Sequence, residues 1–476
     1  MTGVEAPNTA VRPPPWKLEA RSSRGFVITV VAIAVFTDVF IYGMIIPILP
    51  TVLKTRVDIP EDQLQKWMSA LLAAFGGGVL LGSPIFGYFA DKGTSRRLPF
   101  VLGLLALGGS TVMFWFARDG VSLVIARVLQ GLSGAAVWTV GLALVVDTVG
   151  KDRTGLAMSF VSVSTTVGLV SGPFLGGIIL SKAGYHAVFV VAIGLIVLDV
   201  VLRMGMVEKK TASQWLQKHP DGETEGLLSG SSEDSRSQHE VARDSSDPST
   251  ERDSEPDNEG EPAPSGRPGS VPGIVRLLLS GNLLAVLMGA LVNSTITSSY
   301  DTVLPVYVLR TFHWGPFLIG LCFIPLFIPS FFAPIVGTLV DRYGARRVAC
   351  LGFMLNLPVY ILLQLVKHNS TAHQVLLYVF LFFAGVAGTL RDVSLMVVVT
   401  DVVEGLETDW PGIFGEQGGT GQAYGLYNVA WSGGQVLGPL FAGYLVEARG
   451  WATLVTVFGV MSGVTAAVLG ATGRVS

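Results

Sequence analysis

The chain is 476 residues long, half of its residues are apolar, and only 14% are charged. A soluble protein of this length needs more charged side chains to cover its surface, so the composition excludes a soluble enzyme. The net charge of −3 provides no basic surface for nucleic acid.

The N-terminal segment, residues 1–24, is polar and contains three consecutive prolines. The apolar run that follows, Phe26 to Leu49, is long enough to cross a bilayer, which takes roughly 20 residues. We therefore expect a cytoplasmic tail over residues 1–24, no cleaved signal peptide, and a first span that is also the targeting signal.

Further apolar runs follow the first along the whole chain. They are too long and too uniformly apolar for barrel strands of about ten residues, so they predict transmembrane helices. The predicted fold is all-α and integral to the membrane, with one six-helix bundle over residues 25–207 and another over residues 276–471. The twelve spans are expected at 25–50, 67–90, 98–117, 121–147, 155–181, 185–207, 277–309, 316–340, 348–366, 374–401, 422–446 and 451–471.

An acidic segment, residues 208–275, separates the two predicted bundles. Within it, residues 211–270 hold fourteen Asp or Glu and five Lys or Arg among many Ser, Gly and Pro. That composition cannot bury an apolar core, so we expect a disordered cytoplasmic linker. Residues 472–476 are expected to form a second cytoplasmic tail.

Basic residues in the short loops predict the orientation of the spans. Lys and Arg gather in the loops after spans two, four and eight, which lie on the same side as both tails. We expect that side to be the cytoplasm. The Asn369-Ser370-Thr371 triplet then lies outside, where Asn369 is a candidate for N-glycosylation.

Segments of the two predicted bundles match each other in the same order. Gly87 to Arg97 reads GYFADKGTSRR, and Gly337 to Arg347 reads GTLVDRYGARR, at an offset of 250 residues. Further along, GPFLGG from Gly172 matches GPLFAG from Gly438. The chain is therefore expected to consist of two repeated halves, as in transporters that expose a midplane site to each side in turn.

With these motifs the chain resembles the major facilitator superfamily, over nearly all of its length except the tail and the linker. Gly87 to Arg97 is similar to that family's loop between spans two and three, and Arg127 to Gly131 to its fourth-span motif. Gly168 to Gly177 is similar to the fifth-span motif of its twelve-span drug:proton antiporters. Within that branch the chain is similar to vesicular amine transporters and fungal efflux carriers, above all from Asp38 to Pro50.

Asp38 lies about halfway along the first span. An ionisable group at that depth is costly and is a functional candidate by default, able here to take and release a proton. The resemblance implies that it meets the cationic nitrogen of an amine. The alternative is a permanent ion pair with Arg127.

Two further candidates for proton coupling are Arg127 and Asp301. Arg127, early in span four, stays protonated and can tune a neighbouring acid, and the resemblance assigns it to coupling; an interhelical hydrogen-bond anchor is the alternative. Asp301, ahead of Pro305 in span seven, matches an acid of the amine transporters. A solvated residue at the outer mouth is its alternative role.

Arg391 and Asp392 are adjacent in span ten. Charges at that depth are expected to pair, with each other or with Asp301, so Asp392 is a further coupling candidate. A static gate or brace is the equal alternative.

The predicted cavity has lost charges that the amine transporters carry. Asn428 stands where they have an acid, and Phe75 where they have a lysine, which favours a less polar substrate. Polar and aromatic candidates to contact it, each with plain packing as the alternative, are Asn428, Gln435, Tyr424 and Trp431.

Charged residues of the repeated motif lie at the predicted cytoplasmic helix ends: Asp91 and Arg96 after Gly87, and Asp341 and Arg346 after Gly337. We expect them to form ion pairs between the halves in one access state. The alternative is that they only set the topology.

The fifth span carries Gly172, Pro173 and Gly176. The proline bends the helix and the glycines allow close packing, which we expect against span eight as a seal between the halves.

We find no nucleotide-binding loop and no metal spacing, and Cys322 and Cys350 suggest neither a disulfide framework nor a metal site. The expectation is a monomeric, non-enzymatic transporter in the lipid bilayer, without cofactor or metal. It would use a proton gradient to export a small organic compound (a drug, toxin or secondary metabolite), with the plasma membrane favoured over the vacuole. Alternatives are a vacuolar or vesicular importer of a cationic amine, a uniporter or nutrient symporter, and a receptor without transport.

Overall fold

The computed structural model describes residues 18–92, 97–149, 154–206, 280–410 and 420–472. The predicted linker, most of both tails, and Arg96 lie outside these ranges, and the side chain of Asp91 is not described either. Apart from Leu18, the described residues all belong to one compact unit, within residues 19–208 and 272–476.

The described residues of the first half are mostly helical, with short turns between the helices. Ser23 and Asp119 cap helices by accepting from the backbone N–H of Phe26 and Ser122, and the hydrogen bonds from Ser122 keep the pKa of Asp119 below its usual value. The elements are α1 (Leu18–Ser22), α2 (Arg24–Ile45), α3 (Leu49–Thr55), α4 (Leu64–Lys92), α5 (Arg97–Phe116), α6 (Gly120–Ala136), the π-helical turn η1 (Val137–Gly141), α7 (Leu142–Val149) and α8 (Thr154–Gly205).

The second half repeats this pattern, with one span in pieces. Pro325, Pro329 and Pro334 each remove a backbone donor, so the eighth span changes pitch several times along its length. The elements are α12 (Gly281–Phe312), α13 (Pro316–Leu321), α14 (Phe323–Phe327), the 3₁₀ helix η3 (Ile328–Phe332), α15 (Ala333–Tyr343), α16 (Ala345–Leu363), α17 (Thr371–Asp409) and α18 (Thr420–Thr472).

Nine helical stretches of the described residues are long and apolar enough to cross a membrane, and a shorter one covers Phe100–Phe116. Two of the nine, in α8 and α18, are double length and each turn at a glycine with φ of +81°, Gly184 and Gly450. When the two arms of α8 and the two arms of α18 are counted separately and the shorter helix is included, the described residues contain twelve spans. Gly184 follows Pro173 at the same distance along the chain as Gly450 follows Pro439, so the turn belongs to the repeat.

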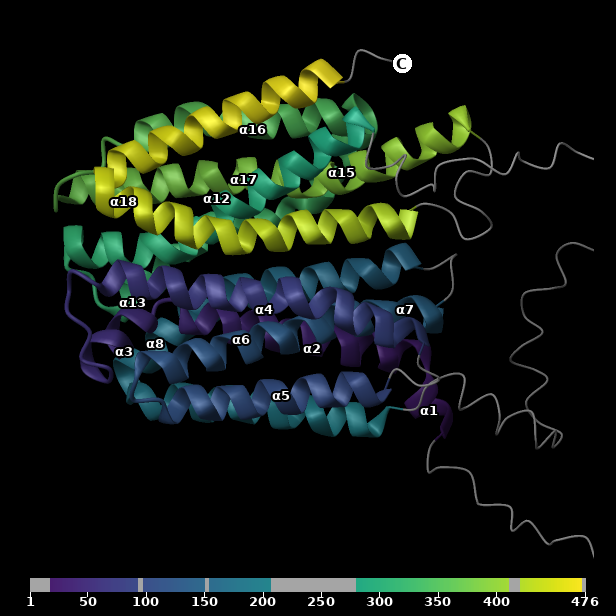
Figure 1. Ribbon diagram of the computed structural model, residues 1–476, viewed down its shortest axis with the longest axis horizontal. Coiled ribbons are helices and arrows are strands. Elements are labelled where there is room, and N and C mark those ends of the chain that lie inside the picture. The colour runs from purple at the N-terminus through teal and green to yellow at the C-terminus, as the bar shows by residue number, and fades with distance from the viewer. Residues whose placement is uncertain (1–17, 93–96, 150–153, 207–279, 411–419, 473–476) are drawn as a thin grey trace, which may run out of the picture. The chain divides into compact units, whose positions relative to one another are not determined.

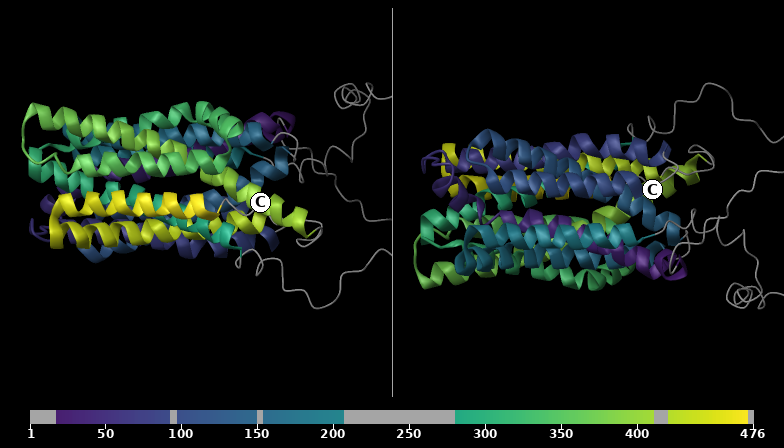
Figure 2. Two further views of the ribbon diagram at one scale, coloured as in Figure 1. Left: turned by 90° about the horizontal axis from the view of Figure 1, so that it is seen from above. Right: turned by 90° about the horizontal axis from the view of Figure 1, so that it is seen from below.

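The axes of the described spans lie roughly parallel to one another, with successive spans running in opposite directions. The first half lies below the second in Figure 1, and both views of Figure 2 show the same alignment. In Figure 1, α3 and α13 lie at one end of the bundle, which we call the outer end, while α1, α7 and the α15–α16 junction lie at the opposite, inner end. α8 and α18 each start and finish at the inner end and turn back at the outer end. The two names follow the orientation that the basic residues predict.

Among the described residues, the apolar core is shared between the halves only at the outer end. One large cluster of buried residues there combines Ile41, Met44 and Leu71 of the first half with Val303 and Phe323 of the second. Towards the inner end each half has a cluster of its own, built around α2 and η1 in the first half and around α16 and α17 in the second. The halves are therefore packed together at the outer end and keep separate cores at the inner end.

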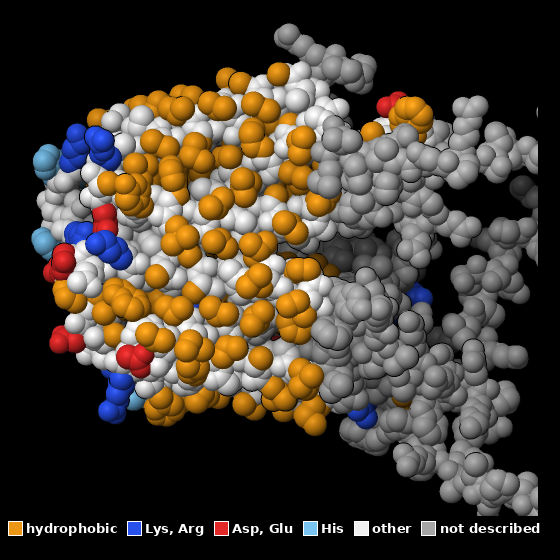
Figure 3. Space-filling model, in the orientation of Figure 1, with side chains coloured by type: hydrophobic (Ala, Val, Ile, Leu, Met, Phe, Trp, Pro, Cys, Tyr) orange, Lys and Arg blue, Asp and Glu red, His pale blue; other side chains and the backbone are white. Residues whose placement is uncertain are grey.

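The outer surface of the spans is apolar. Leucine, valine, phenylalanine and methionine side chains such as Leu105, Val190, Val201 and Met354 are more than half exposed. Figure 3 shows hydrophobic side chains as a broad belt between the two ends of the bundle, while the Lys, Arg, Asp and Glu side chains in view lie towards the ends, most of them at the outer end. Since a soluble monomer rarely exposes such a belt, this surface faces lipid.

Candidate functional site

A polar contact joins the two halves inside the bundle. The Tyr42 hydroxyl of α2 donates to Oδ2 of Asp301 in α12 at 2.8 Å, and Asp301 is buried. The Tyr42 ring lies tilted by 39° against that of Phe75 of α4, with 4.7 Å between the ring centroids. The guanidinium of Arg127 in α6 lies 5.8 Å from both rings. Two of the three predicted coupling residues of this region thus meet through Tyr42, which the sequence analysis did not single out.

Arg127 is completely buried and only partly satisfied. One Nη donates to the Gln130 side chain at 3.3 Å, and the Phe114 ring lies 5.7 Å away. The other Nη and Nε of Arg127, and Oδ1 of Asp301, have no hydrogen-bond partner among the described residues. Unpaired buried polar atoms cost free energy, so Arg127 and Asp301 would gain from new hydrogen-bond partners when the halves move.

Asp38 of α2 is also buried, but it does not take part in the contact between Tyr42, Asp301 and Arg127. Its carboxylate lies against Gly134 of α6, where an added Cβ would come within 3.2 Å of Oδ1, and it interacts with the Trp138 side chain. The alternative of a permanent Asp38–Arg127 ion pair is not what the structure shows, since no such pair forms among the described residues and Arg127 bonds to Gln130.

A buried ion pair in the sixth span escaped the sequence analysis. Nε of Arg203 donates to Asp199 at 3.1 Å, its Nη1 donates to the Phe100 carbonyl at 2.8 Å, and both charged side chains are fully buried. The signal was present in the sequence, because two opposite charges four residues apart in an apolar span face each other on a helix.

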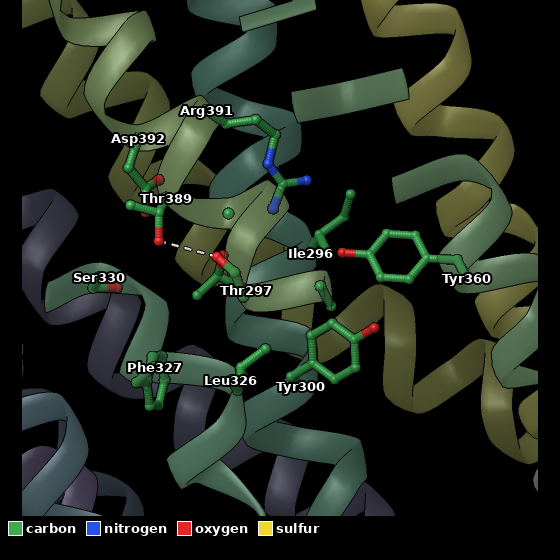
Figure 4. A pocket seen from close by; sticks show the side chains of 13 residues that line it. Ile296, Thr297, Tyr300, Leu326, Phe327, Ser330, Tyr360, Thr389, Arg391 and Asp392 are labelled. Atoms are coloured by element: carbon green, nitrogen blue, oxygen red, sulfur yellow. Dashed lines mark hydrogen bonds between the residues drawn. The ribbon is translucent and has the colours of Figure 1, made fainter. Parts of the chain in front are cut away.

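Arg391 and Asp392 of α17 turn to different partners rather than to each other. Asp392 accepts from the side-chain amide of Asn293 in α12 at 2.5 Å. Arg391 lies over the Phe353 ring at 5.2 Å and meets Asn356, both in α16. The two side chains line a small cavity of about 40 Å³ between α12, α14 and α17, and Figure 4 shows them on different walls of it.

The four predicted cavity residues of the eleventh span do not line that cavity. Asn428 is exposed, whereas Tyr424, Trp431 and Gln435 are half-buried. The Tyr424 hydroxyl lies 2.9 Å from that of Thr400, and the Gln435 backbone packs on Gly76 of α4, at the seam between the halves.

The repeated charged motif is visible only in the second half. Asp341 is exposed, and Arg346 donates to Asn282 and Thr472 at 3.3 and 3.4 Å, both in its own half. Arg96 and the side chain of Asp91 belong to the parts that the structure does not describe, and Gly87 lies within α4. The ion pairs expected between the halves therefore stay a prediction.

The glycines of the fifth span meet two partners. An added Cβ at Gly172 or Gly176 would lie 2.7 Å from the Phe40 carbonyl or 2.5 Å from that of Met44, both in α2 of the same half. The Pro173 carbonyl, by contrast, lies across the seam from Gly320 of α13. Span five thus packs on span one as well as on span eight.

Asn369 lies in the exposed turn between α16 and α17, at the outer end, as the candidate glycosylation site requires. Its side-chain nitrogen donates to the Phe312 carbonyl at 3.4 Å. A glycan on this nitrogen would have to replace that hydrogen bond.

The family model described as Major Facilitator Superfamily matches residues 31–328 and 286–473. The chain belongs to this superfamily. The expectation of a transporter with two six-helix bundles is confirmed, and so is the expectation that it is not an enzyme, since the similar proteins are all transporters of this family.

Several relatives match over most or part of the chain. An uncharacterised MFS-type transporter of Schizosaccharomyces pombe is 32% identical over 90% of this chain and 91% of its own. The MFS-type transporter ppzB of Metarhizium rileyi is 31% identical over 95% and 96%. A probable vesicular acetylcholine transporter-B of Danio rerio is 33% identical, but over only 40% of this chain and 39% of its own.

Among solved structures, the nucleoside transporter NupG matches with a TM-score of 0.64 over 94% of this chain and all of its own. At 12% sequence identity this likeness shows the fold alone.

Proposed function

We propose that this superfamily member is a proton-coupled antiporter that exports a small organic compound by alternating access. It needs no cofactor beyond the proton gradient and works as a monomer. The relatives that match along nine-tenths of the chain are fungal MFS-type transporters, whereas the vesicular relative matches less than half, which favours a fungal-type transporter over a vesicular one.

The observation that carries the proposal is the buried contact between Tyr42, Asp301 and Arg127. It joins the two halves through a group that can gain and lose a proton, beside a cation that cannot. Protonating Asp301 weakens its hold on Tyr42, because a neutral carboxyl is a poorer acceptor than a carboxylate. Proton binding and the contact between the halves are then linked.

The distribution of the core supports the alternating-access part. Residues of both halves share one cluster at the outer end and separate at the inner end, as expected for a cavity closed to the outside. Rocking of the two halves about the midplane would open the outer end and close the inner end.

The test is flux in proteoliposomes of the purified chain, with a panel of organic compounds and an imposed pH gradient. Antiport predicts that substrate moves against its own gradient when protons run the other way. Uptake that ignores the pH gradient for every transported compound would refute proton coupling.

Asp38→Asn tests the first coupling candidate. We expect normal expression and intact substrate counterflow, but proton-driven flux at least about tenfold lower, since a coupling free energy of about 1.4 kcal/mol corresponds to that factor. Serine in place of Thr29, an exposed residue of the same helix, is the control. Coupled transport at the normal rate in Asp38→Asn would remove Asp38 from the mechanism.

The second candidate function is a vacuolar or vesicular importer of a cationic amine. Asp38, buried and without an ion-pair partner among the described residues, together with the vesicular acetylcholine relative, favours it. Competition by simple quaternary and primary amines separates the two, because the export of a largely apolar compound would be insensitive to them. Localising the tagged chain to the plasma membrane or the vacuole gives an independent answer, for which we propose the plasma membrane.

A further inference from the structure

Three arginines are almost completely buried among the described residues, and they differ in how their charge is balanced. Arg203 has a two-pronged ion pair with Asp199. Arg127 lies near Asp301, with Tyr42 between them. Arg391, which is 2% exposed, has no carboxylate within 4.0 Å among the residues that the structure describes.

The groups in direct contact with the guanidinium of Arg391 are neutral. With its side-chain oxygen turned towards Arg391, Asn356 accepts from both Nη atoms and from the Tyr360 hydroxyl. The Phe353 ring covers the guanidinium at 5.2 Å, and Gly352 leaves room for the aliphatic stem. Asp392, the next residue in the chain, acts on this charge only from beyond 4.0 Å, so the guanidinium is buried without a direct ion pair, which is costly.

Two buried donors at the cavity are poorly satisfied. Nε of Arg391 has no acceptor at hydrogen-bond distance among the described residues, and the hydroxyl of Tyr300 has only the Tyr360 hydroxyl near it, without good hydrogen-bond geometry. Both residues line the cavity of about 40 Å³, which has room for a water molecule or a group of similar size. Figure 4 shows that they reach it from different helices, α17 and α12.

Asp392 is the negative group that also lines this cavity. Its Oδ1 accepts from the Asn293 amide, a neutral donor, so its charge is balanced only by Arg391 beyond ion-pair distance. An anion in the cavity must therefore gain more from Arg391 than it loses to repulsion by Asp392.

We propose that this cavity is an anion subsite, in which Arg391 and Tyr300 bind a single carboxylate or halide. If the anion is the acid group of the transported compound, the substrate class is narrowed to molecules with a carboxylate, an inference that rests on the proposed function. If it is chloride from solution, the site is an ion-binding site that gives Arg391 a direct counter-ion.

The test is thermal unfolding of the full-length purified chain in sodium gluconate, whose anion is too large for the cavity. Sodium chloride and sodium formate are then titrated in separately. We expect a saturable rise in Tm for the wild-type chain, none for Arg391→Gln, and a midpoint concentration about tenfold higher for Tyr300→Phe, because one hydrogen bond to an anion is lost.

Tyr307→Phe is the matched control. Tyr307 lies on the same helix as Tyr300, and its hydroxyl bonds to the Val366 carbonyl away from the cavity, so its anion response should equal that of the wild type. Tyr300→Phe and Tyr307→Phe keep the test decisive even if Arg391→Gln does not fold.

The outcomes identify the anion and are independent of proton coupling, since no gradient is present. Saturation by both anions supports the site and points to a carboxylate of the substrate. Comparing the flux of an organic acid with that of its amide would then test whether transport needs the carboxylate. Saturation by chloride alone supports the site as an ion site. No saturable response in the folded wild type, or an unchanged response in Tyr300→Phe and Arg391→Gln, would overturn the proposal.

Discussion

At the scale of single residues, the hydrogen bond from Tyr42 to Asp301 is the contact to break first. A hydrogen bond to a charged group contributes about 1.5–3 kcal/mol, and this one joins the halves. Tyr42→Phe keeps the ring on Phe75 and removes only the hydroxyl. We therefore expect the ratio of molecules closed at the outer end to molecules open there to fall about tenfold or more.

The measurement for Tyr42→Phe is the distance between spin labels at Lys182 and Lys367, exposed residues at the outer ends of the two halves, in a chain without its native cysteines. Tyr185→Phe is the control, because its hydroxyl donates to the Trp115 carbonyl within the first half. An unchanged distance distribution in Tyr42→Phe would show that this hydrogen bond does not hold the halves together.

The Asp199–Arg203 pair makes a separate prediction, about stability. Asp199→Asn leaves Arg203 buried without its counter-charge, which is expected to cost about 3–5 kcal/mol. Lys54→Met breaks the partly exposed Lys54–Glu61 pair and should cost less than about 1 kcal/mol. Unfolding of both variants in detergent measures how much free energy of unfolding each one loses. Equal losses would show that burial does not make the Asp199–Arg203 pair the more important of the two.

At the scale of the helices, spans five and eight form a close backbone contact across the halves. An added Cβ at Gly320 of α13 would lie 2.3 Å from the Pro173 carbonyl of α8, and neither backbone can retreat. Gly320→Ala should therefore open the outer seam and lower transport, at a cost of about 1–3 kcal/mol to the closed arrangement.

Gly337→Ala is the matched variant for this prediction. Gly337 belongs to the same span, in α15, and an added Cβ there meets nothing within 4 Å, so it should be neutral or slightly stabilising. The same pair of spin labels reports both variants. If Gly320→Ala leaves the label distances unchanged, the close contact is not what seals the seam.

At the scale of the whole molecule, the testable property is the orientation of the bundle. The α15–α16 junction lies at the inner end and the turn before α17 at the outer end. A membrane-impermeant maleimide applied to intact cells should label a cysteine at Lys367 and not one at Tyr343, although both positions are exposed. Labelling at Tyr343 from outside would invert the topology and with it the direction of transport.

The sequence by itself determined the number of spans, their lengths and the two-fold repeat. Hydrocarbon thickness fixes how many apolar residues a helix needs, so composition alone marks each span. The twelve expected runs correspond to the observed ones, including the turns at Gly184 and Gly450. The charge pair Asp199–Arg203 could also have been read, because both partners lie on one helix.

Only the tertiary structure decided which buried charges meet. Sequence spacing does not fix how a helix is rotated against its neighbours, so it could not show that Arg127 lies beside Tyr42 rather than Asp38. For the same reason it could not show that Arg391 faces neutral side chains and a cavity. Partners on different helices are set by packing, which depends on every contact of the bundle at once.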